Sequence, residues 1–247
     1  MSVYDWSTQD IQTTGRYLND IWGSSASDLA AVGSDGKIMH YDGTSWTEKP
    51  GHTTNQLHSI WGMSANEMYA VGERGTILEY DGTNWSKMPM NQPNTLYHIW
   101  GNASDNIYAV GESGLILQYD GNTWKEMNSP TINDLFWIWG DAQNNVFIVG
   151  AAGTILSYTG NKWVSMSSPV INDLTCMWGL SANSLYAAGS GGVIIHYDGS
   201  QWTDFMSPIR EDLYGIWGSQ VDDIYVCTTF GQVYHYDGSN WTKVLQD

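Results

Sequence analysis

The chain has 247 residues, which is the length of one large domain or two small ones. Its formal net charge is −17, from 9 Lys and Arg against 26 Asp and Glu. This charge argues against nucleic-acid binding and against binding to anionic lipid, because both depend on clustered Lys and Arg. A hydrophobic content of 42% is enough for a core. No apolar run approaches the roughly 18 residues that a membrane helix needs, so membrane insertion is not expected.

Tryptophan is overrepresented, with 14 residues, and its positions reveal an internal repeat. A first series of Trp-Gly pairs recurs every 39 residues, at Trp22, Trp61, Trp100, Trp139, Trp178 and Trp217. A second series has the same spacing, at Trp46, Trp85, Trp124, Trp163, Trp202 and Trp241. Trp6 is a seventh member of the second series, and Trp137 stands outside both.

Each repeat predicts four short strands, and the copy that spans residues 46–84 shows them in order. Three runs rich in β-branched and aromatic residues are bounded by Gly, Ser or Asn, at residues 57–62, 67–72 and 75–82. The fourth strand follows the next tryptophan, at residues 85–88, and ends before a proline. An Asp-Gly pair predicts a tight hairpin between the third and fourth strands. No segment shows a sustained 3.6-residue apolar period, so no long helix is expected.

Four strands in about 40 residues, repeated six times, predict an all-β fold, a six-bladed β-propeller of four-stranded antiparallel blades. The whole chain, residues 1–247, is then one domain. The last blade has two possible outer strands. Residues 241–247 can complete it locally, which the Asp-Gly hairpin before Trp241 favours. The segment around Trp6 can instead close the ring by pairing into that blade.

Blade geometry predicts that the turns after the first and third strands lie at one end of the disc. That end gathers an acid or amide from the first turn, at Asp28, Glu67, Asp105, Asn144 and Asp222. It also gathers an aspartate from the second turn, at Asp42, Asp81, Asp120, Asp198 and Asp237, beside the tryptophans of the second series. These side chains have two interpretations. The carboxylates close turns and the indoles fill the wedge between blades, or each blade presents an indole and a carboxylate to a sugar.

The opposite end carries loops that differ from copy to copy, such as residues 51–54 against 129–132. A single asymmetric partner is expected to use this variable end, because loops on a rigid scaffold are common binding surfaces. The sequence contains none of the common catalytic or nucleotide-binding motifs: the GxSxG, HExxH, Walker and GxGxxG patterns are absent. No catalytic residue, metal site or cofactor is therefore expected. His40, His196 and His235 share one repeat position, which is expected to be solvated.

The repeat resembles those of bacterial β-propeller proteins. The resemblance rests on Trp-Gly, then Tyr-Ala-Val-Gly at residues 69–72 and 108–111, then Gly-x-Ile-Leu-x-Tyr-Asp-Gly-x-x-Trp. More loosely, the chain is similar to tectonin-type propeller lectins, which implies non-catalytic glycan binding through several equivalent sites. The repeated arginine of six-bladed fucose-binding lectins has no counterpart, since Arg16, Arg74 and Arg210 hold different repeat positions.

The leading hypothesis is therefore a non-catalytic, multivalent carbohydrate-binding protein whose partners are glycans or glycoconjugates. Its sites lie at the end that holds the Trp-Gly and Asp-Gly turns. The alternative is a protein-interaction scaffold that binds one partner through the variable end. A third possibility is an enzyme with its site at the channel mouth. Association of the chain with itself is left open, and the sequence does not fix the cellular compartment.

Overall fold

The computed structural model describes residues 17–245, which form six separate four-stranded sheets with no α-helix among them. Each sheet pairs four consecutive strands in antiparallel order, so each sheet is one blade. The fold class predicted from the repeat is thus confirmed. The prediction for Trp6 falls on residues 1–16, outside the described residues.

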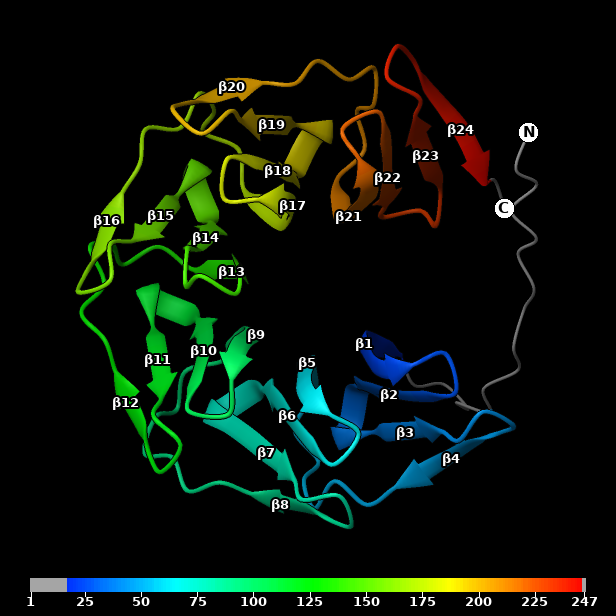
Figure 1. Ribbon diagram of the computed structural model, residues 1–247, viewed down its shortest axis with the longest axis vertical. Helices are drawn as coiled ribbons and strands as arrows, with labels where there is room; N and C mark the ends of the chain where they lie inside the picture. The colour runs from blue at the N-terminus through cyan, green and yellow to red at the C-terminus, as the bar shows by residue number, and fades with distance from the viewer. Residues whose placement is uncertain (1–16, 246–247) are drawn as a thin grey trace.

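The strands follow the repeat, and Figure 1 shows them in order around the disc. Blades 1 to 3 consist of β1 (Leu18–Ser25), β2 (Asp28–Gly33), β3 (Ile38–Tyr41) and β4 (Trp46–Lys49); β5 (Leu57–Ser64), β6 (Glu67–Gly72), β7 (Thr76–Tyr80) and β8 (Trp85–Lys87); β9 (Leu96–Ala103), β10 (Asn106–Gly111), β11 (Ile116–Tyr119) and β12 (Trp124–Glu126). Blades 4 to 6 consist of β13 (Leu135–Gly140), β14 (Val146–Gly150), β15 (Ile155–Tyr158) and β16 (Trp163–Ser165); β17 (Leu174–Ser181), β18 (Ser184–Gly189), β19 (Ile194–Tyr197) and β20 (Trp202–Asp204); β21 (Leu213–Gln220), β22 (Asp223–Thr228), β23 (Val233–Tyr236) and β24 (Trp241–Leu245).

In each blade the first strand lies at the centre of the disc and the fourth at the rim (Figure 1). The second strand of a blade such as blade 2 is packed on both sides, so residues 68–72 of β6 are all buried. This is why the run Met-Tyr-Ala-Val-Gly is continuously apolar instead of alternating. The rim strand β8 buries only Trp85 and exposes the two residues that follow it.

Between the second and third strands, blades 1 to 5 make a single 3₁₀ turn, as at Glu73–Gly75 in blade 2. The glycine that precedes this turn is required by a close approach of two strands. A Cβ on Gly72 would lie 2.0 Å from the carbonyl oxygen of Gln56, which precedes β5. The glycine of the Tyr-Ala-Val-Gly pattern therefore lets the central strand begin directly against its neighbour.

Within residues 17–245 the apolar core is divided into five clusters, and each lies between two consecutive blades. The cluster between blades 1 and 2, for example, joins Val32 and Ile38 to Leu57, Leu78 and Trp85. Most of the stabilising burial is therefore between neighbouring sheets, as expected for stacked repeats that cannot bury their faces alone.

The last blade is completed by its own rim strand, as the hairpin before Trp241 predicts. Tyr236 pairs with Trp241, and β23 and β24 form an antiparallel pair with one register shift, between Val233 and Tyr234. The N-terminal segment is therefore not needed for a fourth strand in this blade.

Candidate functional site

The two ends of the disc carry different loops, and we name them by these loops. The turn face holds the turns between first and second strands and the Asp-Gly hairpins between third and fourth strands. The loop face holds the 3₁₀ turns and the connections from one blade to the next. The predicted glycan-binding residues all lie on or beside the turn face.

The aspartates of the Asp-Gly hairpins close their own turns. In blade 2, the backbone N–H groups of Thr83 and Asn84 both donate to Oδ1 of Asp81 at 2.8 Å. These bonds hold the pKa of the Asp81 carboxyl below its usual value. The same pair of bonds is made by four other aspartates of the predicted site, Asp42, Asp120, Asp198 and Asp237.

Five of the six tryptophans of the second series, all except Trp46, are packed into the interfaces between consecutive blades. Trp85, Trp163 and Trp202 are buried, and the other three are half-buried: Trp46, Trp124 and Trp241. Each indole lies beside the last tyrosine of the preceding strand, as for Tyr80 and Trp85 at 5.2 Å between ring centroids. Such indoles offer little free face on which a pyranose could stack.

The acids and amides predicted for the first turn occupy two different positions. Asp28 and Glu67 are the first residues of β2 and β6, whereas Asp105, Asn144 and Asp222 lie one repeat position earlier, before β10, β14 and β22 begin. The repeat spacing from Asp28 leads to Glu67 and then to residue 106, not 105. These five residues therefore do not occupy equivalent positions in the repeat, and they cannot form one set of equivalent ligands.

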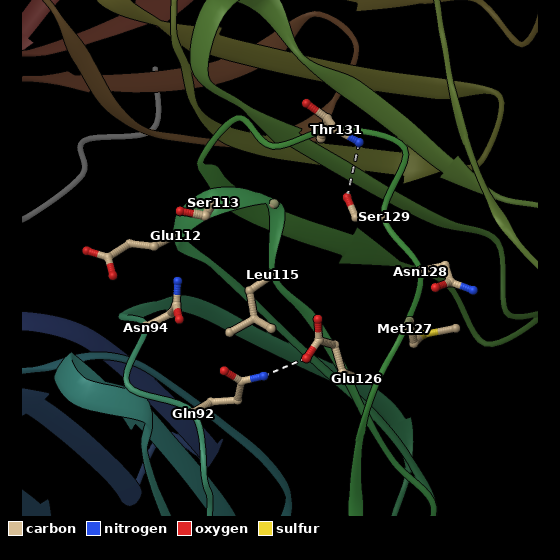
Figure 2. A pocket seen from close by; sticks show the side chains of 11 residues that line it. Gln92, Asn94, Glu112, Ser113, Leu115, Glu126, Met127, Asn128, Ser129 and Thr131 are labelled. Carbon is tan, nitrogen blue, oxygen red and sulfur yellow. Dashed lines mark hydrogen bonds between the residues drawn. The ribbon is translucent and has the colours of Figure 1, made fainter.

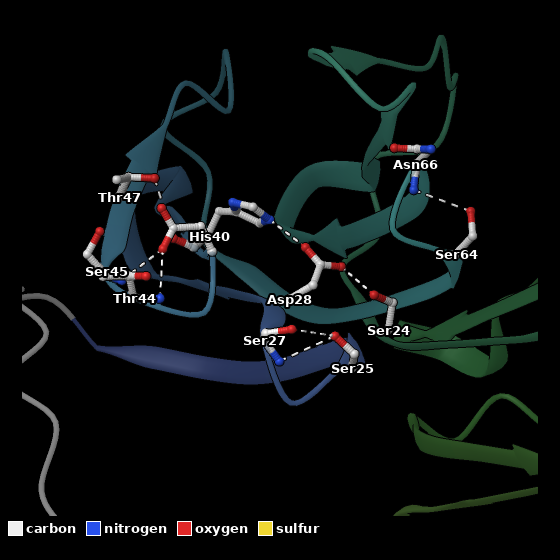
Figure 3. Close-up of polar contacts among 11 residues, drawn as sticks. Ser24, Ser25, Ser27, Asp28, His40, Thr44, Ser45, Thr47, Ser64 and Asn66 are labelled. Atoms are coloured by element: carbon white, nitrogen blue, oxygen red, sulfur yellow. Dashed lines mark hydrogen bonds and ion pairs between the residues drawn. The ribbon is translucent and has the colours of Figure 1, made fainter.

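Asp28 is engaged by two partners, which Figure 3 shows. His40 Nε2 lies 2.8 Å from its Oδ1, and the Ser24 hydroxyl donates to its Oδ2. Burial opposes ionisation here, but the bonds from Ser24 and His40 hold the pKa of Asp28 below its usual value. The serine and the histidine both contact one carboxylate instead of each other, so the imidazole does not activate the hydroxyl for nucleophilic attack.

Blade 6 repeats this arrangement, with Ser219 and His235 on Asp223. His40 and His235 are half-buried, not solvated as the sequence predicts. Each histidine lies on the third strand of its blade, beside the second strand. The first residue of that second strand is the aspartate that the imidazole contacts, so the ring lies against the sheet.

The loop face contains a cavity of about 830 Å³ at the mouth of the central channel. We name it the channel mouth. Its inner wall is built from the second residue of each central strand. These residues, in blade order, are Asn19, His58, Tyr97, Phe136, Thr175 and Tyr214.

A β-bulge presents each of these six side chains. In blade 3, Leu96 pairs with Gly111 and His98 with Val110, so Tyr97 is an extra residue with no opposite partner. The register shifts at the same position in the other five blades. Bulges redirect a side chain out of the regular alternation. Strict alternation in the sequence would assign these residues to the packed faces, which is why the repeat pattern alone did not identify them.

The aromatic members of the mouth lie side by side. Ring centroids are 5.7 Å apart for His58 and Tyr97, and 5.5 Å for Tyr97 and Phe136 in an edge-to-face arrangement. Next to them, His98 stacks on Trp137 with centroids 3.8 Å apart. Burial lowers the pKa of His98 to about 3, and its Nδ1 is enclosed without a hydrogen-bond partner. The imidazole therefore stays neutral at physiological pH.

Carboxylates surround this aromatic group. Burial is the main cause that raises the pKa of the Tyr97 hydroxyl to about 12, and the negative charges of Asp134 and Glu112 raise it further. Burial also lowers the pKa of His58, against the opposing charges of Glu73 and Glu112. The channel mouth thus combines neutral rings with an anionic rim.

Backbone bonds fix the rim carboxylates in place. Ser113 N–H donates to Asp134 at 2.8 Å and Thr95 N–H donates to Glu112 at 2.7 Å. Asp173 and Asp212 accept the same bond from the 3₁₀ turn of the preceding blade. These aspartates therefore link adjacent blades by hydrogen bonds. They also add negative charge to the loop face.

A second cavity on the loop face extends this acidic surface outward. It measures about 430 Å³ and is bounded by the connection from blade 2 and by blade 3 (Figure 2). Gln92 donates to Glu126 across it at 2.5 Å. Glu112 borders this cavity and also acts on Tyr97 in the channel mouth. No group of three or more metal-ligating residues occurs within residues 17–245, and no helix in that range is long and apolar enough to span a membrane.

Comparisons with known proteins support the propeller fold. A family model for the DUF6242 beta propeller domain matches residues 38–136, which is less than half of the chain. No curated protein matches the sequence.

Solved structures match over most of the chain. The structure of YCF48 bound to D1 peptide has a TM-score of 0.79 at 17% identity, over 98% of this chain and 85% of the other. YCF48 from Cyanidioschyzon merolae has a TM-score of 0.75 at 14% identity, over 93% and 85%. The WD40 beta propeller domain of Doa1 has a TM-score of 0.75 at 12% identity, over 93% and 81%. Identities this low establish the fold alone. Because these neighbours are YCF48 and WD40 propellers, the resemblance to tectonin-type lectins is not supported.

Proposed function

We propose that this protein is an interaction scaffold that binds one extended, basic segment of a partner protein at the channel mouth. The observation that carries the proposal is the group of neutral aromatic rings enclosed by a fixed anionic rim. Arginine and lysine side chains bind both elements, because the ammonium or guanidinium pairs with carboxylates and packs over aromatic faces.

Electrostatics favours such a partner beyond the mouth itself. The net charge of −17 gives the whole surface a negative potential that attracts cationic segments and repels acidic ones. At the mouth, His58 and His98 add no positive charge at neutral pH, because burial lowers the pKa of both. A basic segment therefore meets no opposing charge from the imidazoles of the inner wall.

The asymmetry of the mouth supports a single partner instead of several equivalent ligands. The six bulge positions hold six side chains of five different types, and the aromatic ones are concentrated in blades 2 to 4 and in blade 6. Among proteins with this fold, the YCF48 structure is described as bound to a peptide. That similarity adds support for a peptide-binding role here.

Selection from a displayed library of random peptides tests the proposal directly. We expect enriched peptides to contain Arg or Lys beside apolar residues, and to bind in a salt-dependent way. Replacing Tyr97 and Phe136 together by Ser should weaken binding at least tenfold, which corresponds to roughly 1.4 kcal/mol. The matched control is Asp42→Asn with Asp81→Asn on the turn face, which should leave peptide affinity unchanged.

A glycan array with the same variants separates this function from the glycan hypothesis. Glycan binding that the turn-face variants abolish and the Tyr97 and Phe136 variants leave intact would contradict the proposal. Enrichment of acidic peptides, or equal binding by the mouth variants and the wild type, would also contradict it.

A further inference from the structure

The smaller cavity of the loop face holds two carboxylates that come from different elements. We name it the blade 3 pocket; its volume is about 430 Å³ (Figure 2). Glu112 begins the 3₁₀ turn after β10, and Glu126 ends the rim strand β12. Leu115, which follows the turn and is 7% exposed, lines the same pocket. Among residues 17–245, no basic side chain forms an ion pair with either glutamate.

Blade 1 shows which group such a carboxylate receives. Glu48 holds the repeat position of Glu126, two repeats of 39 residues earlier, and Lys37 holds that of Leu115. The Lys37 ammonium lies 2.8 Å from Oε2 of Glu48, and its side chain is only 4% exposed. Blade 3 therefore keeps the carboxylate of this ion pair but replaces its lysine by a leucine.

The backbone around this place is alike in the two blades, so the comparison is one of side chains. A Cβ on Gly36 in blade 1 would lie 2.1 Å from the carbonyl oxygen of Thr53. The equivalent distance in blade 3, from a Cβ on Gly114 to the carbonyl oxygen of Thr131, is also 2.1 Å. The two blades thus differ here in the basic side chain and not in the course of the chain.

Blade 5 also places a cation beside the acid at this position. Its acid is Asp204, and the cavity that Asp204 borders measures about 240 Å³ and is lined by Arg210 as well. The Arg210 guanidinium donates to the carbonyl oxygens of Ser207 and Ile209. The other blades have no acid here and carry Lys87, Ser165 and Lys243. Of the three acids at this repeat position, only Glu126 lines a cavity to which the described chain contributes no lysine or arginine.

Both carboxylates of the blade 3 pocket are held in place by the protein. Thr95 N–H donates to Glu112 at 2.7 Å, and the Gln92 side-chain amide donates to Glu126 at 2.5 Å. A cation that enters therefore meets acceptors that are already ordered, which lowers the entropic cost of binding. Leu115 gives the pocket an apolar wall, and the aliphatic stem of a lysine or arginine can pack against it.

We infer that the blade 3 pocket binds the cationic side chain of a lysine or arginine from another molecule, with its charge at Glu112 and Glu126. The ligand then supplies the group that blade 1 provides for itself. Glu112 also acts on Tyr97 in the channel mouth, so the pocket adjoins the mouth. The assignment of this cation to the basic segment of the partner rests on the function proposed above, and it directs that segment outward from the mouth across blade 3.

The test uses N-acetylarginine amide as a probe, because its only charge is the guanidinium. Met127 lines the blade 3 pocket and Met206 lines the cavity of blade 5, so NMR spectra with ¹³C-labelled methionine methyl groups report on both places. At constant ionic strength, we expect saturable shifts of the Met127 signal at millimolar probe and none of the Met206 signal, because Arg210 already lines that cavity. N-acetylcitrulline amide, the neutral isostere, should shift neither signal.

Two variants remove the site in different ways. Glu126→Gln should weaken probe binding at least about fivefold, because a charge-assisted bond to the guanidinium is lost. Leu115→Lys introduces the lysine of blade 1 and should abolish probe binding, since its ammonium pairs with Glu126. Asp105→Asn removes the same charge at an exposed position of the turn face and is the control. It should bind the probe like the wild type.

The combined Tyr97→Ser and Phe136→Ser variant separates the pocket from the channel mouth. It should still bind the probe, so a mouth that binds no peptide does not hide the result at the pocket. Peptide binding at the mouth without probe binding at the pocket would overturn the pocket alone and leave the proposed function standing. Equal probe affinities of the wild type and Glu126→Gln, or equal shifts with the citrulline compound, would also overturn the inference.

Discussion

The half-buried imidazole of His98, whose Nδ1 is enclosed, predicts a specific loss of stability in weak acid. The ring stacks on Trp137 in the wall of the channel mouth, and its Nδ1 has no partner. Burial lowers its pKa to about 3, so the folded protein holds this histidine neutral. In the unfolded chain the same residue takes up a proton near pH 6.5. Below that pH, the unfolded state binds more protons than the folded state, and acid therefore favours unfolding.

The magnitude follows from the two pKa values. The contribution is fully present above pH 6.5 and is lost as the pH falls from 6.5 toward 3. The free energy of unfolding falls by up to about 1.4 kcal/mol per pH unit within this window. Between pH 7 and pH 5, His98 therefore accounts for a loss of at most about 2 kcal/mol.

The perturbation is His98→Phe, which keeps an aromatic ring against Trp137 and removes the titrating nitrogens. Urea unfolding at pH 5, 6 and 7 gives the free energy of unfolding of each protein. We expect the variant to lose about 2 kcal/mol less than the wild type between pH 7 and pH 5. His58 and His196 also have lowered pKa values and stay in both proteins, so the difference isolates His98.

His52→Asn is the matched control, because His52 is exposed with a φ of 50°, a conformation that Asn tolerates. Its pH dependence should equal that of the wild type. If His98→Phe and the wild type lose stability in parallel between pH 7 and pH 5, the reasoning about the enclosed imidazole is refuted.

Two further predictions concern the packing of the tryptophans. Trp163→Ala, at an indole that is 4% exposed, should cost about 3–5 kcal/mol in urea unfolding, whereas Trp217→Ala, at 58% exposure, should cost less than about 1 kcal/mol. Equal costs would show that Trp217 is packed as tightly as Trp163. Gly140→Ala should cost about 1–3 kcal/mol, because its Cβ would overlap Trp100. The same change should cost much less in a Trp100→Ala background, and a full cost there would place the strain elsewhere.

The architecture could be predicted from the sequence because the pattern of one blade recurs six times along the chain. Trp-Gly, Tyr-Ala-Val-Gly and Asp-Gly mark the ends of strands, and the glycines are needed for close approach or for hairpins. The local completion of blade 6 followed from the hairpin before Trp241, which matches its equivalents. These features depend only on neighbours in the chain, so sequence reasoning reaches them.

The channel mouth could not be found in this way, because it depends on a bulge at the start of each central strand. A bulge adds one residue and reverses the faces of the strand beyond it, and no local signal separates Tyr97 from a residue in regular pairing. The exposure of the Trp217 side chain could not be predicted from the sequence either. Trp178 and Trp217 hold the same repeat position, and only the presence of a following blade decides which of them is covered.

Repetition also explains why the turn face attracted the first functional hypothesis and the loop face carries the proposed function. A residue that recurs in nearly every blade performs a task that every blade needs, such as the closing of a hairpin by Asp81 and its equivalents. The bulge position has no task that recurs in every blade: Asn19 and Thr175 donate side-chain hydrogen bonds to the carbonyl oxygens of Leu57 and Leu213 in the next blade, whereas the other four blades carry different residues there. Its residues are therefore free to differ between blades, and they do differ. Six side chains of five different types around one opening cannot form six equal sites, but they can form one site that recognises a single orientation of a single partner.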